Sequence, residues 1–264
     1  MTAQHIDNVE GVITALGLPG SCRVDQRVPK KLLLENGAPT AADKRLIVDV
    51  IEEIQWVAAL KPNTIGVSDY RDDLREYLEI DILTVTLRVT DDKPAKSARI
   101  HELMHRAVPY PVLLLLKSGQ FVTLSLAHKR WAQKEMGKVV LDGGIVSASL
   151  PDDDALLAEV MQAFMQSLAL SSQRHITLFE LYQNWIESIQ ALVAARLTGM
   201  FKTADSPEQA AVRRQALQEC ERLELEVNRL RTQAAKEKQL ARQVELNLAL
   251  KRVQAHLAAA RHLL

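Results

Sequence analysis

Apolar residues recur with helical spacing at two places near the start of the chain. In residues 4–16 and 40–60 they stand three and four positions apart, as on a helix that buries one face. Thr40 fits the N-cap position of the second segment, with Asp43 at the reciprocal position of a capping box. Pro62 follows that segment and is a typical helix-ending residue. We therefore expect one helix over each segment.

Strand-like patterns prevail after this second helix. Residues 79–89 alternate between two faces, and residues 112–116 are apolar throughout, as in a strand buried on both sides. Residues 97–106 between them have helical spacing, so the whole segment predicts a right-handed parallel crossover. Asp142-Gly143-Gly144 predicts a hairpin turn. Further short strands are expected at 28–33, 64–67, 121–128, 139–141 and 145–150. The expected fold class is therefore α/β, with a mixed sheet and flanking helices over residues 1–150.

Start signals for three helices follow this α/β domain. A proline followed by three acids opens the first, and Thr177 with Glu180 forms a capping box before the second. These two helices make a helical connector over residues 151–205. The strongest signal begins at Ser206, which is followed by proline, glutamate and glutamine in the preferred positions. No helix-breaking residue comes after it, so one helix, roughly 85 Å long, is expected over residues 206–264.

The last segment repeats apolar residues every seven positions, which is typical of a coiled coil. A shift in this repeat near Leu248 is interpreted as a stutter, which locally unwinds such a coil. A homo-oligomer is favoured because a lone long helix would leave its apolar stripe in water. The residues expected to hold the copies together are Leu223, Val227, Leu230, Val244, Leu248, Leu250 and Leu257. The alternative is that the helix folds back on the two helices before it.

Composition narrows the class of protein without indicating a reaction. The chain has 264 residues, 47% of them apolar and 25% charged, which is enough for a buried core in one large or two small domains. Its formal net charge is zero, which excludes a uniformly basic nucleic-acid binder. Two cysteines cannot form a disulfide scaffold. There is no leader-like start and no apolar run of about 18 residues, so we expect a cytoplasmic protein without membrane contact.

One short motif matches the H-E-x-x-H pattern of zinc peptidases. On a helix, His101 and His105 share a face and could grip a metal ion while Glu102 activates water. Arginines flank the motif, however, and no pattern supplies a third ligand. We therefore expect no metal and no cofactor, and we interpret the segment as an amphipathic helix that packs on the sheet. A zinc metallopeptidase is the alternative.

A second enzyme class is suggested by the order of the elements. Helix, strands, helix and strand is the order of the restriction-endonuclease-like core, and Asp81 stands where that core has its first metal-binding acid. The acid-x-lysine that should follow on the next strand is missing, because residues 112–116 are apolar. A nuclease is therefore kept only as an alternative, and no catalytic residue is assigned.

Two groups of basic residues are candidates for binding nucleic acid or a partner protein. One contains Lys129, Arg130 and Lys134, and the other contains Lys30 and Lys31. Cations of this kind contact backbone phosphates irrespective of the base sequence. The alternative is that the neighbouring tryptophan anchors the first group to the following helices and that the charges only surround its ring.

Several segments resemble a bacterial family of unknown function that is often encoded beside helicase and DNA-methyltransferase genes in restriction-like defence islands. The similarity is carried by residues 28–33 and 54–64, by the run from Ala107 through two prolines into residues 112–116, and by Lys129. The resemblance implies an accessory role in phage defence or DNA modification, with a helicase, a methyltransferase or DNA as partner. We therefore expect a non-catalytic accessory or scaffolding subunit that is multimerised by its C-terminal coil.

Overall fold

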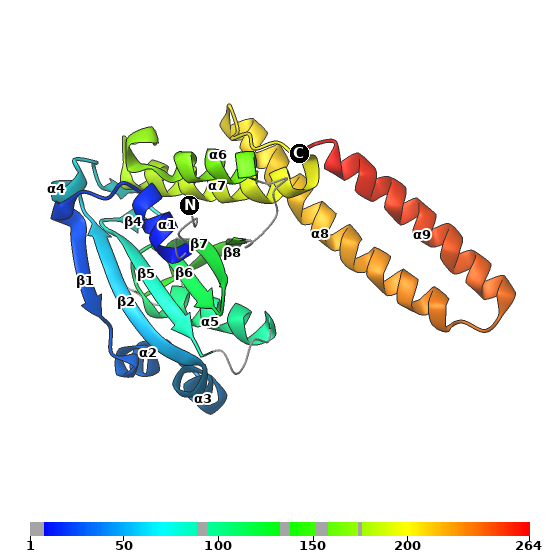
Figure 1. Ribbon diagram of the computed structural model, residues 1–264, viewed down its shortest axis with the longest axis horizontal. Helices are drawn as coiled ribbons and strands as arrows, with labels where there is room; N and C mark the ends of the chain where they lie inside the picture. The colour runs from blue at the N-terminus through cyan, green and yellow to red at the C-terminus, as the bar shows by residue number, and fades with distance from the viewer. Residues whose placement is uncertain (1–7, 89–93, 133–137, 151–157, 174–175) are drawn as a thin grey trace, which may run out of the picture. The chain divides into compact units, whose positions relative to one another are not determined.

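The central element of the structure is a six-stranded mixed sheet (Figure 1). The computed structural model describes residues 8–88, 94–132, 138–150, 158–173 and 176–264. The strands lie in the order β1-β2-β5-β6-β7-β8; β5 and β6 run parallel, and the other neighbouring pairs run antiparallel. Their bounds are Arg23–Arg27 (β1), Ile51–Leu60 (β2), Ile80–Leu87 (β5), Val112–Ser118 (β6), Phe121–Trp131 (β7) and Val139–Leu150 (β8). A separate small sheet pairs β3 (Tyr70–Arg71) with β4 (Glu76–Tyr77).

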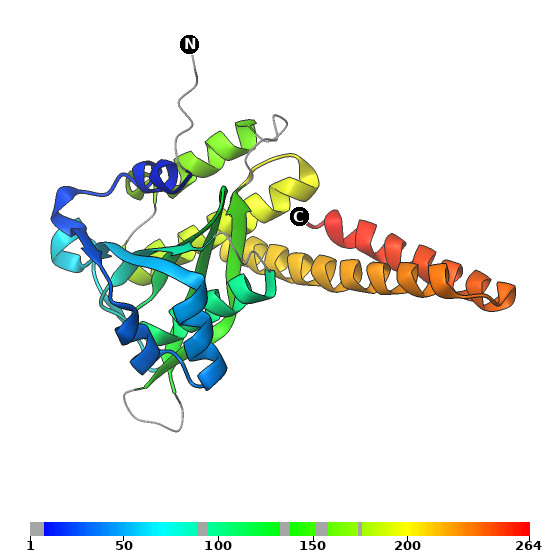
Figure 2. The same cartoon turned by 60° about the horizontal axis from the view of Figure 1, so that its bottom comes forward.

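Helices cover both faces of the six-stranded sheet (Figures 1 and 2). One face carries α2 (Lys30–Asn36), α3 (Ala41–Val50) and α5 (Pro94–Ala107), which share a buried apolar core with β2, β5 and β6. The other face carries α1 (Asn8–Ala15), α6 (Ala158–Leu168) and the first half of α7 (Leu178–Thr198). A short helix, α4 (Pro62–Ile65), and the 3₁₀ turns at Gly20–Cys22 and Leu170–Ser172 lie in connections. The predicted α/β class with a mixed sheet is confirmed.

Two side chains of α7 fix this helix to the layers beneath it. The Tyr182 hydroxyl donates to the Val112 carbonyl oxygen at 2.8 Å and accepts from the Ala127 N–H at 2.9 Å, so it connects β6 and β7. The fully buried Trp185 donates from Nε1 to the Leu168 carbonyl oxygen at 3.0 Å. These bonds satisfy the polar atoms of two large rings, which can then stay inside the core.

The predicted helix over residues 40–60 is wrong in its second half. The segment forms α3 and then β2, although the expected Thr40 cap on the Asp43 N–H is present at 3.1 Å. β2 has register shifts that leave Ile51 and Ile54 opposite Leu87 and Val85, two residues of one face. The bulge between them separates Ile51 and Ile54 by three positions, which imitates the spacing of a helix.

Three smaller predictions of strands are also wrong. Residues 28–33 enter α2 instead of a strand, and residues 64–67 begin inside α4. Asp142-Gly143-Gly144 is not a hairpin turn, because β8 runs through it and pairs with β7 on both sides. Gly143 has φ 83, and the glycine allows a local irregularity within the strand instead of a reversal of the chain. The parallel pairing of β5 with β6 around α5 is confirmed.

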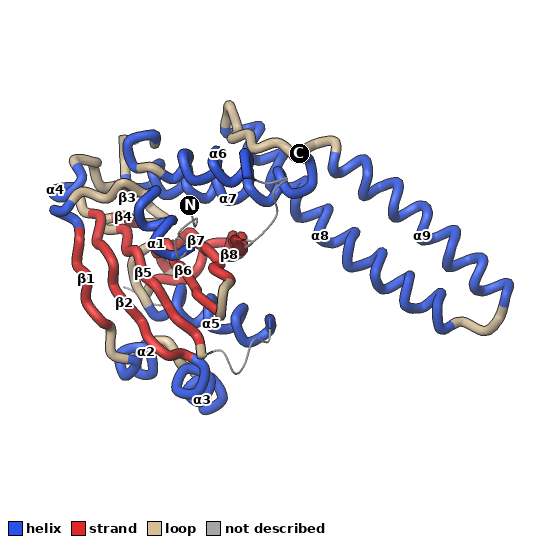
Figure 3. Tube along the Cα trace, in the orientation of Figure 1, coloured by secondary structure: helices blue, strands red, loops and turns tan. Residues whose placement is uncertain are grey.

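The single C-terminal helix predicted over residues 206–264 is wrong. The chain forms α8 (Pro207–Lys236) and α9 (Leu240–Arg261), which lie side by side as a helical hairpin (Figure 3). The predicted cap at Ser206 is confirmed, because its hydroxyl accepts from the Gln209 N–H at 3.2 Å. Residues 237–239 contain neither glycine nor proline, so ordinary signals of a helix end do not mark the turn.

The chain divides into two compact units, residues 1–189 and 190–264, and the division falls inside α7. We call them the α/β unit and the helical unit. Helix α6 and the first half of α7 belong to the α/β unit, whereas the end of α7, α8 and α9 make up the helical unit. No helix in the described segments is both long enough and apolar enough to cross a membrane.

Candidate functional site

A hollow of about 390 Å³ opens beside the start of β5 in the α/β unit, and we call it the β5 pocket. Its walls come from α2 and the segment before it, from β2 and β5, and from the end of α5 with the following loop. Most of its lining is apolar or aromatic: Val28, Pro29, Leu32, Leu33, Ile54, Trp56, Leu83, Met104, Ala107, Val108, Pro109 and Tyr110. Gln26, Arg27 and Asp81 complete the lining.

Prolines and a glycine shape the β5 pocket locally. Pro29 directly precedes α2 with φ −64, a value to which its ring is restricted. Pro109 and Pro111 follow α5 and prevent the helix from continuing. Gly37 ends α2 against Ala107, where an added Cβ would lie 2.5 Å from the Ala107 Cβ. Glycine at this position therefore lets α2 approach the end of α5 and close one wall.

Asp81 provides an unusual carboxyl group at the β5 pocket. The residue is 5% exposed, and its Oδ1 atom has no hydrogen-bond partner among the described residues. Its backbone N–H donates to the Pro111 carbonyl oxygen at 2.9 Å, which ties the start of β5 to the loop after α5. Burial and the neighbouring Glu79 carboxylate raise the pKa of Asp81 to about 7. Near neutral pH the carboxyl group can therefore exist in either protonation state.

Lys129 is buried on β7, where it is 3% exposed and its Nζ donates to the Val108 carbonyl oxygen. Burial lowers the pKa of Lys129 to about 7, while the Asp81 carboxyl group acts in the opposite direction. From the sequence we grouped this lysine with surface cations, but it lies inside the α/β unit. Alternation along β7 places Ser125 and Lys129 on one face, and this is the sequence signal for its burial.

The two histidines of the H-E-x-x-H motif share one hydroxyl group. Nδ1 of His101 lies 2.7 Å, and Nε2 of His105 2.9 Å, from Oγ of Ser125 on β7. Burial lowers the pKa of His101 to about 4 and that of His105 to about 3, so both rings are neutral at physiological pH. The preferred interpretation, a helix that packs on the sheet, fits this arrangement.

Glu102 of the same motif is directed to other partners. Its two carboxylate oxygens pair with Arg99 at 2.6 Å and with Arg106 at 2.7 Å, along the partly exposed side of α5. Among the described residues, no group of three or more His, Cys, Asp or Glu side chains is arranged to hold a metal ion. The geometry therefore gives the zinc-peptidase alternative neither a placed general base nor, in these segments, a third ligand.

Three of the other predicted cations, Lys30, Lys31 and Arg130, have local partners. Lys30 donates from Nζ to the Ile51 carbonyl oxygen, and Lys31 lies 3.7 Å from a Glu35 carboxylate oxygen. Arg130 lies 3.5 Å from Asp142. Lys134 falls outside the described residues. Lys30 and Lys31 lie on α2, whereas Lys129 and Arg130 lie on β7. The two predicted basic groups therefore belong to different elements of the fold.

The predicted oligomerisation residues separate into two sets. Leu223, Val227 and Leu230 are buried on α8, and Leu257 is buried on α9; Leu250 packs partly buried against this core. Val244 and Leu248 on α9 are instead 50% and 52% exposed. Leu240 is 76% exposed and precedes them at the same four-residue spacing, but the seven-residue repeat did not include it. We call Leu240, Val244 and Leu248 the α9 stripe.

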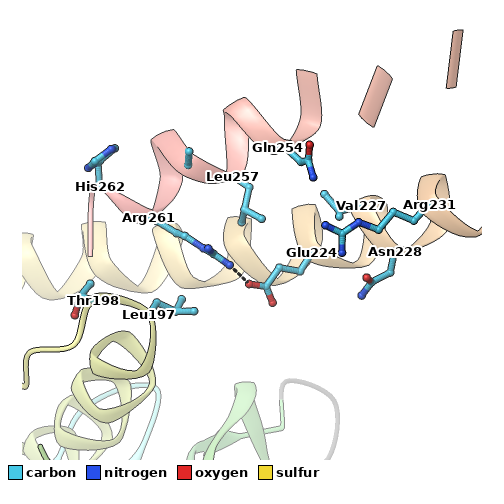
Figure 4. A pocket seen from close by; sticks show the side chains of 11 residues that line it. Leu197, Thr198, Glu224, Val227, Asn228, Arg231, Gln254, Leu257, Arg261 and His262 are labelled. Atoms are coloured by element: carbon cyan, nitrogen blue, oxygen red, sulfur yellow. Dashed lines mark hydrogen bonds and ion pairs between the residues drawn. The ribbon is translucent and has the colours of Figure 1, made fainter. Parts of the chain in front are cut away.

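A second hollow, of about 790 Å³, lies within the helical unit (Figure 4). The end of α7 contributes Leu197 and Thr198, and the remaining lining comes from α8, from α9 and from His262 directly after α9. Glu224 on α8 and Arg261 on α9 form an ion pair at 2.9 Å inside it, as Figure 4 shows. This ion pair joins α8 to α9 at the end of the hairpin away from the turn. The hollow is therefore lined by both charged and apolar groups, and this lining does not favour one class of ligand.

The fold and its two hollows define a two-part protein, an α/β unit followed by a helical hairpin. Residues 16–257 match the family described as "Domain of unknown function (DUF4391)". The match covers most of the chain, so the protein belongs to the DUF4391 family. No curated protein and no solved structure matches the chain.

Proposed function

We propose that the protein is a non-catalytic accessory subunit whose copies associate through the α9 stripe. The observation that carries this proposal is that α9 is apolar on two opposite sides. At about 100° per residue, the centre of the α9 stripe lies opposite Val253 and Ala260, which face the core with α8. The second side packs against α8, whereas the first is exposed. A helix with two apolar faces fits two packing partners.

A second copy of the chain suits the stripe because the charges beside it are self-complementary. Glu245 and Arg252 are both exposed and lie along the same edge of the stripe. If two α9 helices pack antiparallel about Leu248, Glu245 of each copy faces Arg252 of the other. Such an isologous contact uses one surface patch twice and forms a closed dimer.

The proposed context is the one that the sequence resemblance implies, a bacterial phage-defence or DNA-modification system with a helicase, a methyltransferase or DNA as partner. One observation favours a binding role over the zinc-peptidase alternative. Glu102 is paired with arginines away from the buried histidines. For contact with DNA, Arg27 and Lys31 are the more exposed cations on the segment before and within α2.

Substitutions in the stripe test the self-association. We expect the full-length protein to be a dimer by light scattering, and V244E together with L248E to make it monomeric. L225E is the matched control, because Leu225 is exposed on α8 outside the stripe. A monomeric wild-type protein at micromolar concentration, or a dimer that the double substitution leaves intact, would contradict the proposal.

Charge reversal tests the identity of the occupant. E245R alone is expected to weaken the dimer, and E245R combined with R252E is expected to restore it, because the two charges exchange places across the interface. Failure of this restoration, with the stripe still required, would mean that the stripe contacts a different protein or pairs in another register.

A further inference from the structure

We propose that the β5 pocket binds a planar heteroaromatic ring that carries an amino group, of the cytosine or adenine type. The lining combines an apolar cleft with the Asp81 Oδ1 atom, an acceptor that has no hydrogen-bond partner in the described part of the chain. Binding sites for small ligands have this composition, with mostly apolar walls and a few polar groups that set the orientation. Binding at this pocket does not depend on association through the α9 stripe.

The walls favour a flat ring. Trp56 lines the pocket from β2, and its Nε1 donates to the Ala58 carbonyl oxygen at 3.1 Å, which restrains the orientation of its ring. Tyr110 provides a second aromatic side chain in the loop after α5 and is 38% exposed. Aromatic side chains bind nucleobases by stacking, irrespective of which base is present.

The polar end favours an amino group over other donors. The Val108 carbonyl oxygen already accepts from Lys129, whereas the Asp81 Oδ1 atom has no hydrogen-bond partner among the described residues. A carboxylate accepts from the exocyclic amino group of cytosine, and adenine presents a similar donor. A flat amino-bearing ring also fills the apolar part of the lining, which a small alkylammonium ion does not. Above pH 7, where Asp81 is mainly a carboxylate, thymine would present an oxygen in the same place and leave Asp81 without a donor.

The charged residues beside the β5 pocket indicate whether a phosphate on the ligand would be bound. Arg27 is the cation in the lining, and it already lies 3.5 Å from a Glu53 carboxylate oxygen. Glu52 and Glu53 line an adjoining hollow together with Arg27 and Lys30. A free phosphate must therefore compete with carboxylates, and we expect a nucleoside to bind about as well as its monophosphate.

Calorimetric titration of the full-length protein at pH 8 with cytidine, adenosine and thymidine, each as the 2′-deoxynucleoside, tests the proposal. We expect binding of the first two and at least about tenfold weaker binding of thymidine, as for loss of one hydrogen bond to a charged group. Single-stranded oligo(dC) and oligo(dT) form a second arm. Tighter binding of oligo(dC) than of cytidine would identify the source as a base within a strand, and equal binding would identify a free nucleoside.

D81N should abolish the preference for amino-bearing bases, while D25N, which alters an exposed carboxylate, should leave it unchanged. If D81N fails to fold, Y110A provides an independent variant, because its ring lies at the surface and its loss should weaken cytidine and thymidine alike. Equal binding of cytidine and thymidine by the wild type, no binding at millimolar concentration, or an unchanged preference in folded D81N would overturn the proposal.

Discussion

The α/β unit and the helical unit leave opposite kinds of groups without partners. In the α/β unit the rings of Tyr182 and Trp185 are buried and hydrogen-bonded, but the buried Asp81 retains an oxygen that has no hydrogen bond within the described segments. In the helical unit the core between α8 and α9 is closed, but three large apolar side chains of α9 remain exposed. A missing hydrogen bond is satisfied by a small polar ligand, whereas an apolar stripe is satisfied only by another surface. The two units are therefore suited to different classes of partner.

The largest expected effect comes from removing a ring that ties α6 and α7 together. W185A should lower the free energy of unfolding by about 3–5 kcal/mol, because the residue is fully buried and its Nε1 bonds to Leu168. Denaturant unfolding measures the change. W131A is the control on a half-buried tryptophan and should cost clearly less. An equal loss of unfolding free energy in W185A and W131A would contradict this prediction, because the two rings differ in burial.

Acid should destabilise the α/β unit through its buried histidines. Their pKa values are lowered in the folded state, to about 4 for His101 and about 3 for His105, so below pH 6.5 the unfolded chain binds more protons. The stability they contribute is complete above pH 6.5 and is lost as the pH falls towards these values. At pH 5.5 the expected loss is about 1.4 kcal/mol per histidine. Thermal melts at pH 7.5 and 5.5 measure it.

The matched variant for this pH dependence is H101Q combined with H105Q. Neither glutamine titrates, but both can still form a hydrogen bond with Ser125. The difference in stability between pH 7.5 and pH 5.5 should therefore decrease by the amount that the two histidines contribute. An unchanged pH dependence in the folded double variant would show that other groups cause the acid sensitivity.

The smallest effect is expected from making the α9 stripe polar without charge. V244S together with L248S should change the free energy of unfolding of the dissociated protein very little, within about 0.5 kcal/mol, since both residues are half exposed. L223S is the contrasting change, because Leu223 is buried between α8 and α9, and it should cost several times more. Similar costs for both variants would mean that the stripe is already covered within one chain.

The sequence was informative where pattern and geometry agree. The parallel β5–α5–β6 unit followed from a run of alternating residues, a helical run and an apolar run, and the caps at Thr40 and Ser206 are present as expected. Local sequence patterns predict such features correctly because intrinsic propensity and tertiary packing favour the same conformation.

The wrong predictions have one physical cause in common. The spacing of apolar residues along the sequence does not show which element packs against each of them. Ile51 and Ile54 have helical spacing because a bulge lies between them, and only the partner strand reveals it. Val244 and Leu248 continue the seven-residue repeat of α8, yet they lie on the outer side of α9 once the chain reverses. The shift in the repeat near Leu248, which we interpreted as a stutter, instead marks the change from exposed apolar residues of α9 to those that pack against α8.

The β5 pocket was not predictable from any motif. Asp81 was identified as a position for a metal-binding acid, and Lys129 as a surface cation. Their relation depends on the positions of β5 and β7 on either side of β6, and on the loop after α5 that accepts from Lys129. Long-range sheet pairing of this kind leaves no signature at fixed spacing in the sequence.

The short connection at residues 237–239 has a consequence for the order of folding. α8 and α9 join through neighbouring segments, whereas the sheet must first bring together distant ones, such as Arg23 with Ala58. Chains with local contacts fold in microseconds to milliseconds, and chains with distant pairings fold more slowly. On refolding, the hairpin should therefore be complete before the β5 pocket exists, so two chains can meet through α9 while their sheets are still forming.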